Sequence, residues 1–152
     1  LNRSNDVELD FDFEKIKEKT KDNPVYYVQY AYARINSIVR TLKKTLNDNI
    51  SVSPNSFSPN QYEEKINRKI FEWPKIIESA ATKLEPHKIP FYLYELSTLF
   101  HSYWSKGNED NRFKFVENGK VKREESLIFI FLIAVVIKNG MNILGVSLPE
   151  KM

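Results

Sequence analysis

The sequence contains no cysteine, only four glycines and only two histidines. Without cysteine the chain has no disulfide, no Cys-type zinc site and no thiol nucleophile, and it fits a reducing compartment. Two histidines are too few for a histidine-rich metal site, and four glycines leave no room for a glycine-rich phosphate loop. These shortages exclude several classes of metalloenzyme and nucleotide-binding protein, and we expect no metal site.

The charge is only weakly positive. The 152 residues carry 23 Lys and Arg against 20 Asp and Glu, a net charge of +3, so a basic surface would have to be local. The composition is that of one folded domain, because 41% of the residues are hydrophobic and 28% are charged. The aromatic content is high, with 10 Phe, 8 Tyr and 2 Trp, which is a first indication of a role beyond packing.

Residues 1–22 differ from the rest of the chain. They are polar and net acidic, resemble neither a secretory nor a mitochondrial address, and begin with Leu1. Apolar residues alternate with acidic ones from Val7 to Phe13, which predicts an extended, non-helical segment. We interpret the chain as a piece of a longer protein.

Apolar residues at steps of three and four predict a bundle of helices over the remaining residues. The predicted ranges are 24–46, 61–72, a stretch from Pro74 through Leu84 that either kinks or restarts the second helix, 86–104, and 124–144. The longest apolar run, residues 127–137, is too short for a membrane span and predicts a buried core helix. Residues 105–125 are read as a polar connection with a small hairpin at Asn118-Gly119. The predicted fold class is all-α, with four to five helices and a short non-helical N-terminal extension.

No set of side chains forms a catalytic constellation. The pairs Glu63-Glu64 and Glu124-Glu125 are interpreted as solvated helix faces and N-terminal turns. His87 is interpreted as a surface or capping residue, and His101 as a histidine at the edge of the core.

The aromatic residues are more informative. Tyr27, Tyr30 and Arg34 fall on one helix face, and Tyr103-Trp104 with Lys106 are predicted to close another helix. Rings beside cations form a platform on which unstacked nucleobases can lie. Two alternatives remain open at this point: tyrosines at the rim of a core, or a patch that binds a protein.

Four segments, in order along the chain, resemble the arginyl-tRNA synthetase family. They are residues 23–35 (NPVYYVQYAYARI), 84–87 (LEPH) with Tyr92-Leu93, 100–107 (FHSYWSKG), and 138–152, which ends in PEKM. The resemblance implies that residues 23–152 form the C-terminal anticodon-binding helical domain. Residues 1–22 would be a remnant of the catalytic domain and a linker.

The resemblance also implies a function. Members of this family ligate L-arginine to tRNA(Arg) with ATP and magnesium in a catalytic domain whose HIGH-type and KMSKS-like motifs this sequence lacks. We therefore expect the chain to be inactive alone and to need no cofactor of its own. The expected partners are the anticodon stem-loop of tRNA(Arg) and the catalytic domain of the same protein. The expected location is the cytoplasm, as a monomer and without a membrane.

The site residues follow from the same resemblance. Tyr30 and Trp104 are expected to stack with or support an anticodon base, and Met152 is expected near that pocket. Arg34 would hold a phosphate or pair within the bundle, while Lys106 and Arg112 are weaker candidates for contacts with the RNA backbone. Tyr27 completes the predicted set from the aromatic face of the first helix. Two alternatives to this assignment are the corresponding domain of the cysteine or methionine enzyme and a helical module that binds a protein.

Overall fold

The computed structural model describes residues 20, 22–42, 58–114, 116–122 and 124–152. The predicted strand-like segment, and all of the predicted N-terminal region 1–22 except residues 20 and 22, lie outside these residues. In chain order the helices are α2 (Pro24–Thr41), α3 (Gln61–Phe71), α4 (Trp73–Thr82), α5 (Lys88–Glu109) and α6 (Glu124–Ile143). The predicted all-α class is therefore confirmed.

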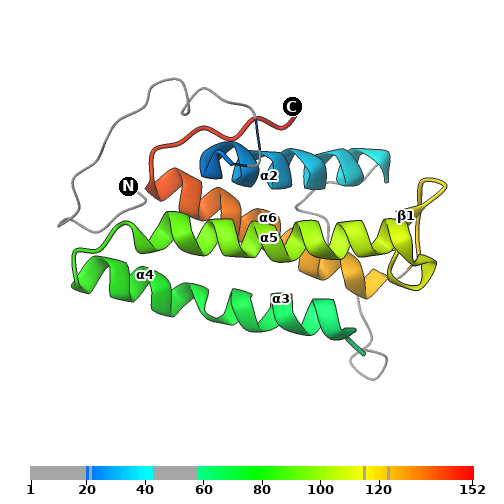
Figure 1. The fold of residues 1–152 in the computed structure, drawn as a ribbon, viewed down its shortest axis with the longest axis horizontal. Coiled ribbons are helices and arrows are strands. Elements are labelled where there is room, and N and C mark those ends of the chain that lie inside the picture. The colour runs from blue at the N-terminus through cyan, green and yellow to red at the C-terminus, as the bar shows by residue number, and fades with distance from the viewer. Residues whose placement is uncertain (1–19, 21, 43–57, 115, 123) are drawn as a thin grey trace.

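Helix α5 is the centre of the bundle. It packs against α2, α3, α4 and α6, and Figure 1 shows α2 along one side of it, α3 and α4 along the other, and α6 behind. The core consists of apolar side chains that these helices bury against one another, among them Ile35, Leu93, Phe100 and Ile133. Burial of such a surface is the main driving force for this arrangement.

Helix α6 is the apolar helix that the sequence predicts to lie in the core. The window Glu125–Ile143 is long and apolar enough to cross a membrane, but 61% of it is buried inside the protein, which is typical of a core helix. The helix ends at Ile143, and Gly145 follows at φ +68°, where the Val146 N–H donates to the Met141 carbonyl at 2.9 Å. This left-handed end suits glycine and turns the chain back toward α2.

Several predicted boundaries are wrong. Helix α2 ends at Thr41, with Leu42 as its C-cap, instead of at the predicted residue 46; residues 43–46 lie outside the described ranges. Helix α4 ends at Thr82, and Leu84 lies beyond it at φ 55° with 77% of its surface exposed. Of the two alternatives left open for Pro74, a new helix is the correct one: α4 begins at Trp73, and Pro74 occupies its first turn, where a missing N–H costs little.

The predicted end of helix α5 is also wrong, because the helix continues to Glu109 instead of ending near Trp104. Gly107 is buried within it, and a Cβ at this position would lie 3.2 Å from the Phe113 carbonyl oxygen. The glycine therefore allows close packing of the following turn, η2 (Asn111–Phe113), and does not end the helix. The predicted hairpin is present as β1 (Val116–Glu117) and β2 (Lys120–Val121), with Asn118-Gly119 at the turn.

Glu63 is a further correction, because it is fully buried rather than solvated. Its carboxylate accepts hydrogen bonds from the Asn60 N–H at 2.8 Å, the Tyr103 hydroxyl at 2.8 Å and the Ser126 hydroxyl at 2.7 Å. The bond from Asn60 is half of a capping box, which explains why the glutamate belongs at this position of α3. Burial raises the pKa of Tyr103 to about 12, so its hydroxyl stays protonated and donates.

Candidate nucleic-acid interface

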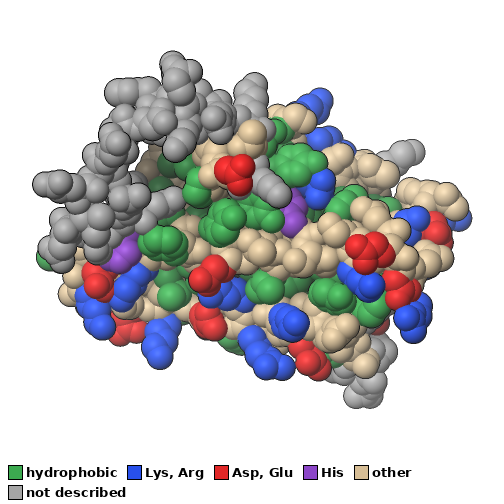
Figure 2. Space-filling model, viewed as in Figure 1, with side chains coloured by type: hydrophobic (Ala, Val, Ile, Leu, Met, Phe, Trp, Pro, Cys, Tyr) green, Lys and Arg blue, Asp and Glu red, His purple; other side chains and the backbone are tan. Residues whose placement is uncertain are grey.

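A groove of about 560 Å³ lies where α2 faces the last turns of α5 and the C-terminal segment. Its lining residues come from four parts of the chain that packing brings together: Tyr30, Ala33, Arg34, Ser37, Ile38, Arg40, Thr41, Trp104, Val116, Lys151 and Met152. Its volume lies within the range of roughly 300–1,000 Å³ that is usual for ligand clefts. In Figure 2 hydrophobic side chains gather along the junction of α2 and α5, with a histidine and a basic side chain among them.

Local sequence sets the start of α2 and hence the orientation of its face. The Asn23 side chain accepts hydrogen bonds from the backbone N–H groups of Val25 and Tyr26, and Pro24 occupies the first turn. Helical periodicity then places Tyr30 and Arg34 on the same side, one turn apart.

Arg34 lies at the centre of the groove. Its guanidinium carbon is 4.4 Å from the centroid of the Tyr30 ring and 5.2 Å from that of the Trp104 ring. One Nη group donates a short hydrogen bond to the Tyr30 hydroxyl, and the other lies 3.3 Å from Nδ1 of His101. Two rings from different helices thus lie next to one fixed cation, an arrangement with cation–π character.

A second, smaller pocket of about 250 Å³ adjoins the groove and shares two of its residues. It is lined by Tyr26, Tyr27, Tyr30, Arg34 and His101. The Tyr26 and Tyr30 rings are stacked at 6.3 Å with 4° between their planes, and the Tyr27 ring contacts Tyr94 at 5.1 Å. Burial raises the pKa of Tyr27, so its hydroxyl stays protonated at neutral pH.

The C-terminal segment forms one rim of the groove and is attached to α2 at two points. The Gln29 side-chain amide donates to the Ser147 carbonyl at 2.8 Å, and the Arg40 guanidinium donates to the Glu150 carbonyl at 3.1 Å. Figure 1 shows this segment running back along α2. The two bonds place Lys151 and Met152 beside the groove, where 52% of the Met152 surface remains exposed.

The electrostatics of the groove favour an anion. Arg34, Arg40 and Lys151 line it, and none of its described lining residues is acidic. Within the described ranges no group of three or more His, Asp or Glu side chains is arranged to hold a metal ion. The groove thus combines flat rings, an apolar wall and positive charge, which together suit a base with its attached phosphate.

Of the six predicted site residues, the structure brings five together. Tyr30, Arg34, Trp104 and Met152 line the groove, and Tyr27 lines the adjoining pocket. Lys106 lies elsewhere on α5, in a cleft with residues of α3, where it forms an ion pair with Glu109 at 3.2 Å.

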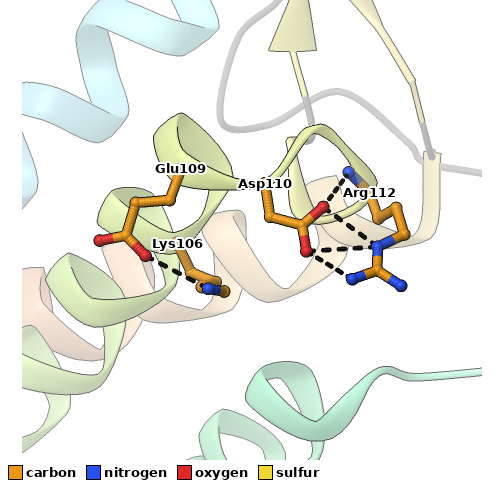
Figure 3. Close-up of polar contacts among 4 residues, drawn as sticks. All are labelled: Lys106, Glu109, Asp110 and Arg112. Carbon is orange, nitrogen blue, oxygen red and sulfur yellow. Dashed lines mark hydrogen bonds and ion pairs between the residues drawn. The ribbon is translucent and has the colours of Figure 1, made fainter.

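The weaker candidate Arg112 is also engaged by an acidic neighbour. It binds Asp110 through several hydrogen bonds, the shortest at 2.8 Å, and these lower the pKa of Asp110 to about 2. Figure 3 shows Lys106 and Arg112 each turned toward an acidic side chain. In these pairs Glu109 and Arg112 are exposed while Lys106 and Asp110 are half-buried, and neither cation lines the groove.

Sequence reasoning missed several residues of this site. Ser37, Arg40 and Thr41 follow Tyr30 and Arg34 at helical spacing, so the periodicity of α2 contains a signal for them. No local signal identifies Val116 or Lys151, which reach the groove only through the fold. The interpretation of His101 as a histidine at the edge of the core is confirmed, since 8% of its surface is exposed.

Comparison with known proteins bears on the identity of this domain. The chain is 53% identical over 152 residues to the arginine–tRNA ligase of Pelagibacter ubique and 40% identical over 157 residues to that of Ruegeria pomeroyi. Both comparisons cover all of this chain but only 26% and 27% of the relatives, so the chain spans about a quarter of their length.

Solved structures agree on the fold. An arginyl-tRNA synthetase structure from Campylobacter jejuni superposes with a TM-score of 0.82 at 26% identity, covering 99% of this chain and 31% of that one. The Thermus thermophilus arginyl-tRNA synthetase, at 23% identity and a TM-score of 0.68, covers 93% of this chain and 23% of that one and supports the fold alone. Residues 28–152, which include the whole groove, match the family described as the DALR anticodon binding domain, and the chain belongs to that family.

Proposed function

We propose that this chain is the anticodon-binding part of an arginine–tRNA ligase and that the groove between α2 and α5 receives bases of the tRNA anticodon loop. The observation that carries the proposal is the convergence of Tyr30, Trp104 and Arg34 in one basic groove. Rings of this kind stack on any unstacked base, and cations beside them contact the phosphates.

The rest of the activity belongs to the parent protein. By its similarity to arginine–tRNA ligases, that protein ligates L-arginine to its tRNA with ATP and magnesium in a catalytic domain and acts in the cytoplasm. The domain boundary at residues 22–23 and the monomeric state are parts of the same proposal. Under this proposal the present chain contributes affinity and selection of the tRNA.

Two substitutions in the groove test the proposal. Tyr30→Ala and Trp104→Ala should each weaken binding of an RNA hairpin that carries an arginine anticodon by about 5- to 150-fold, since a stacked base is worth roughly 1–3 kcal/mol. The matched control is Phe71→Ala, an aromatic residue on α3 that is 76% exposed and lies outside the groove. Binding is measured by fluorescence anisotropy at two salt concentrations, with thermal melting as a check of folding.

The same experiment separates the alternatives. Tighter binding of a cysteine or methionine anticodon hairpin would assign the domain to one of those synthetases. Unchanged hairpin binding by both folded groove variants would remove the groove from RNA recognition. If the wild-type chain shows no salt-dependent RNA binding, and if Tyr30→Ala and Trp104→Ala abolish its association with a protein partner, the domain is a module that binds a protein.

A further inference from the structure

His101 is buried, and it contacts Arg34 without lining the larger groove itself. Its Nε2 lies 3.4 Å from the Tyr27 carbonyl oxygen, and its Nδ1 lies 3.3 Å from Nη1 of Arg34. Both contacts are satisfied together by a neutral imidazole with its hydrogen on Nε2, which donates to the carbonyl while Nδ1 accepts from the guanidinium.

Aromatic contacts hold the imidazole in this place. Its centroid is 4.5 Å from that of Tyr27, 5.6 Å from that of Tyr30 and 5.5 Å from that of Phe100. The ring therefore packs against both α2 and its own helix α5. Among the described residues, Arg34 is the charged group in contact with it, and the tyrosines are its other titratable neighbours.

The consequence concerns Arg34. An arginine side chain has several rotatable bonds, and its guanidinium holds one orientation only where acceptors restrain it. Here the restraints are the Tyr30 hydroxyl on one side and His101 Nδ1 on the other. A guanidinium has five N–H donors, so two hydrogen bonds leave others for a phosphate or a base edge.

We propose that His101 is a positioning residue for RNA binding: it accepts from Arg34 and so holds the guanidinium between the rings of Tyr30 and Trp104. This inference rests on the proposed function of the groove. His101 itself does not touch the RNA, and its effect passes through Arg34.

The proposal is tested with five variants, one of them a double variant, and the arginine-anticodon hairpin. His101→Phe keeps a buried ring but removes the acceptor, and should weaken binding about 3- to 10-fold, the effect of one hydrogen bond. His101→Asn, whose Oδ1 occupies the place of Nδ1, should recover at least half of that loss. Arg34→Lys keeps the charge at a half-buried position but cannot bridge Tyr30 and His101, and should weaken binding by a similar factor. In an Arg34→Ala background, His101→Phe should have no further effect.

The outcomes are distinguishable. The positioning role would be overturned if folded His101→Phe bound the hairpin with wild-type affinity. It would also be overturned if His101→Phe weakened binding equally in the wild-type and the Arg34→Ala backgrounds. If His101→Phe does not fold, the pair His101→Asn and Arg34→Lys decides the question, and wild-type affinity of Arg34→Lys is the overturning result. If Tyr30→Ala and Trp104→Ala also bind normally, the function of the groove fails; if they weaken binding while the His101 and Arg34 variants do not, only the role of His101 fails.

Discussion

The guanidinium of Arg34 on α2 lies 5.2 Å from the ring centroid of Trp104 on α5. This contact exists because α2 and α5 pack side by side, and it joins two of the four segments on which the family resemblance is based. One face of the resulting groove belongs to each helix, and the C-terminal segment supplies the rim. Each of the following predictions concerns a part of this arrangement or of the scaffold beneath it.

Lys151 is expected to contact an RNA phosphate. A plot of log K against log salt concentration has a negative slope. Lys151→Ala should reduce the magnitude of this slope by about one, because one fewer counterion is released on binding. The control is Lys138→Ala, another exposed lysine, which lies on α6 outside the groove and should leave the slope unchanged. Equal slopes for wild type and Lys151→Ala would remove Lys151 from the interface.

Glu63 is expected to stabilise the fold without contributing to RNA binding. Glu63→Ala leaves the Tyr103 and Ser126 hydroxyls and the Asn60 N–H without their acceptor, so the free energy of unfolding should fall by about 2–4 kcal/mol. The matched control is Glu64→Ala on the same turn, whose side chain is 51% exposed and should change stability by no more than about 0.5 kcal/mol. Urea denaturation measures the free energy of unfolding of both variants. Equal values for Glu63→Ala and Glu64→Ala would contradict a stabilising role of the buried network.

Gly140 allows α6 to approach α5 closely. A Cβ at this position would lie 2.8 Å from both Cδ atoms of Leu93, a side chain that is fully buried. Gly140→Ala should therefore destabilise the protein by about 1–2 kcal/mol, the cost of overpacking less the better helix propensity of alanine. In a Leu93→Ala background the same change should be neutral or stabilising. A loss of the same size in both backgrounds would show that Leu93 is not the cause.

His101 should make the stability of the fold depend on pH. Burial, with a smaller contribution from Arg34, lowers the pKa of His101 to about 4 from its usual 6.5. Between these values the unfolded chain binds a proton that the folded chain does not, so stability is complete above about pH 6.5 and falls as the pH decreases toward 4. The expected loss between pH 7 and pH 4 is roughly 2–3 kcal/mol.

The comparison that isolates this histidine is His101→Phe, which should lose that much less of its stability over the same pH interval. Chemical denaturation at several pH values gives both profiles. Parallel profiles for the two proteins would mean that His101 titrates in the folded state as it does in the unfolded chain.

Local sequence was sufficient where a helix boundary depends on neighbouring residues. The start of α2 follows from Asn23 and Pro24, and the end of α6 follows from Gly145, because capping bonds form within a few residues of one another. The prediction from sequence was wrong about the end of α5 near Gly107, because whether a glycine ends a helix or allows close contact depends on what packs against it. The prediction that Glu63 is solvated was wrong for the same reason: Tyr103 and Ser126, whose hydroxyls donate to its carboxylate, are distant from it in the chain.

The sequence by itself determined the helical class, the family and the aromatic residues of the candidate site, because periodicity, caps and ordered motifs are properties of short segments. Only the tertiary structure decided which of those residues share a groove. Trp104, Lys151 and Met152 meet the face of α2 through the packing of α2 on α5 and through the bonds from Gln29 and Arg40 to the C-terminal segment. Such proximity depends on how buried faces fit together, which no single segment specifies.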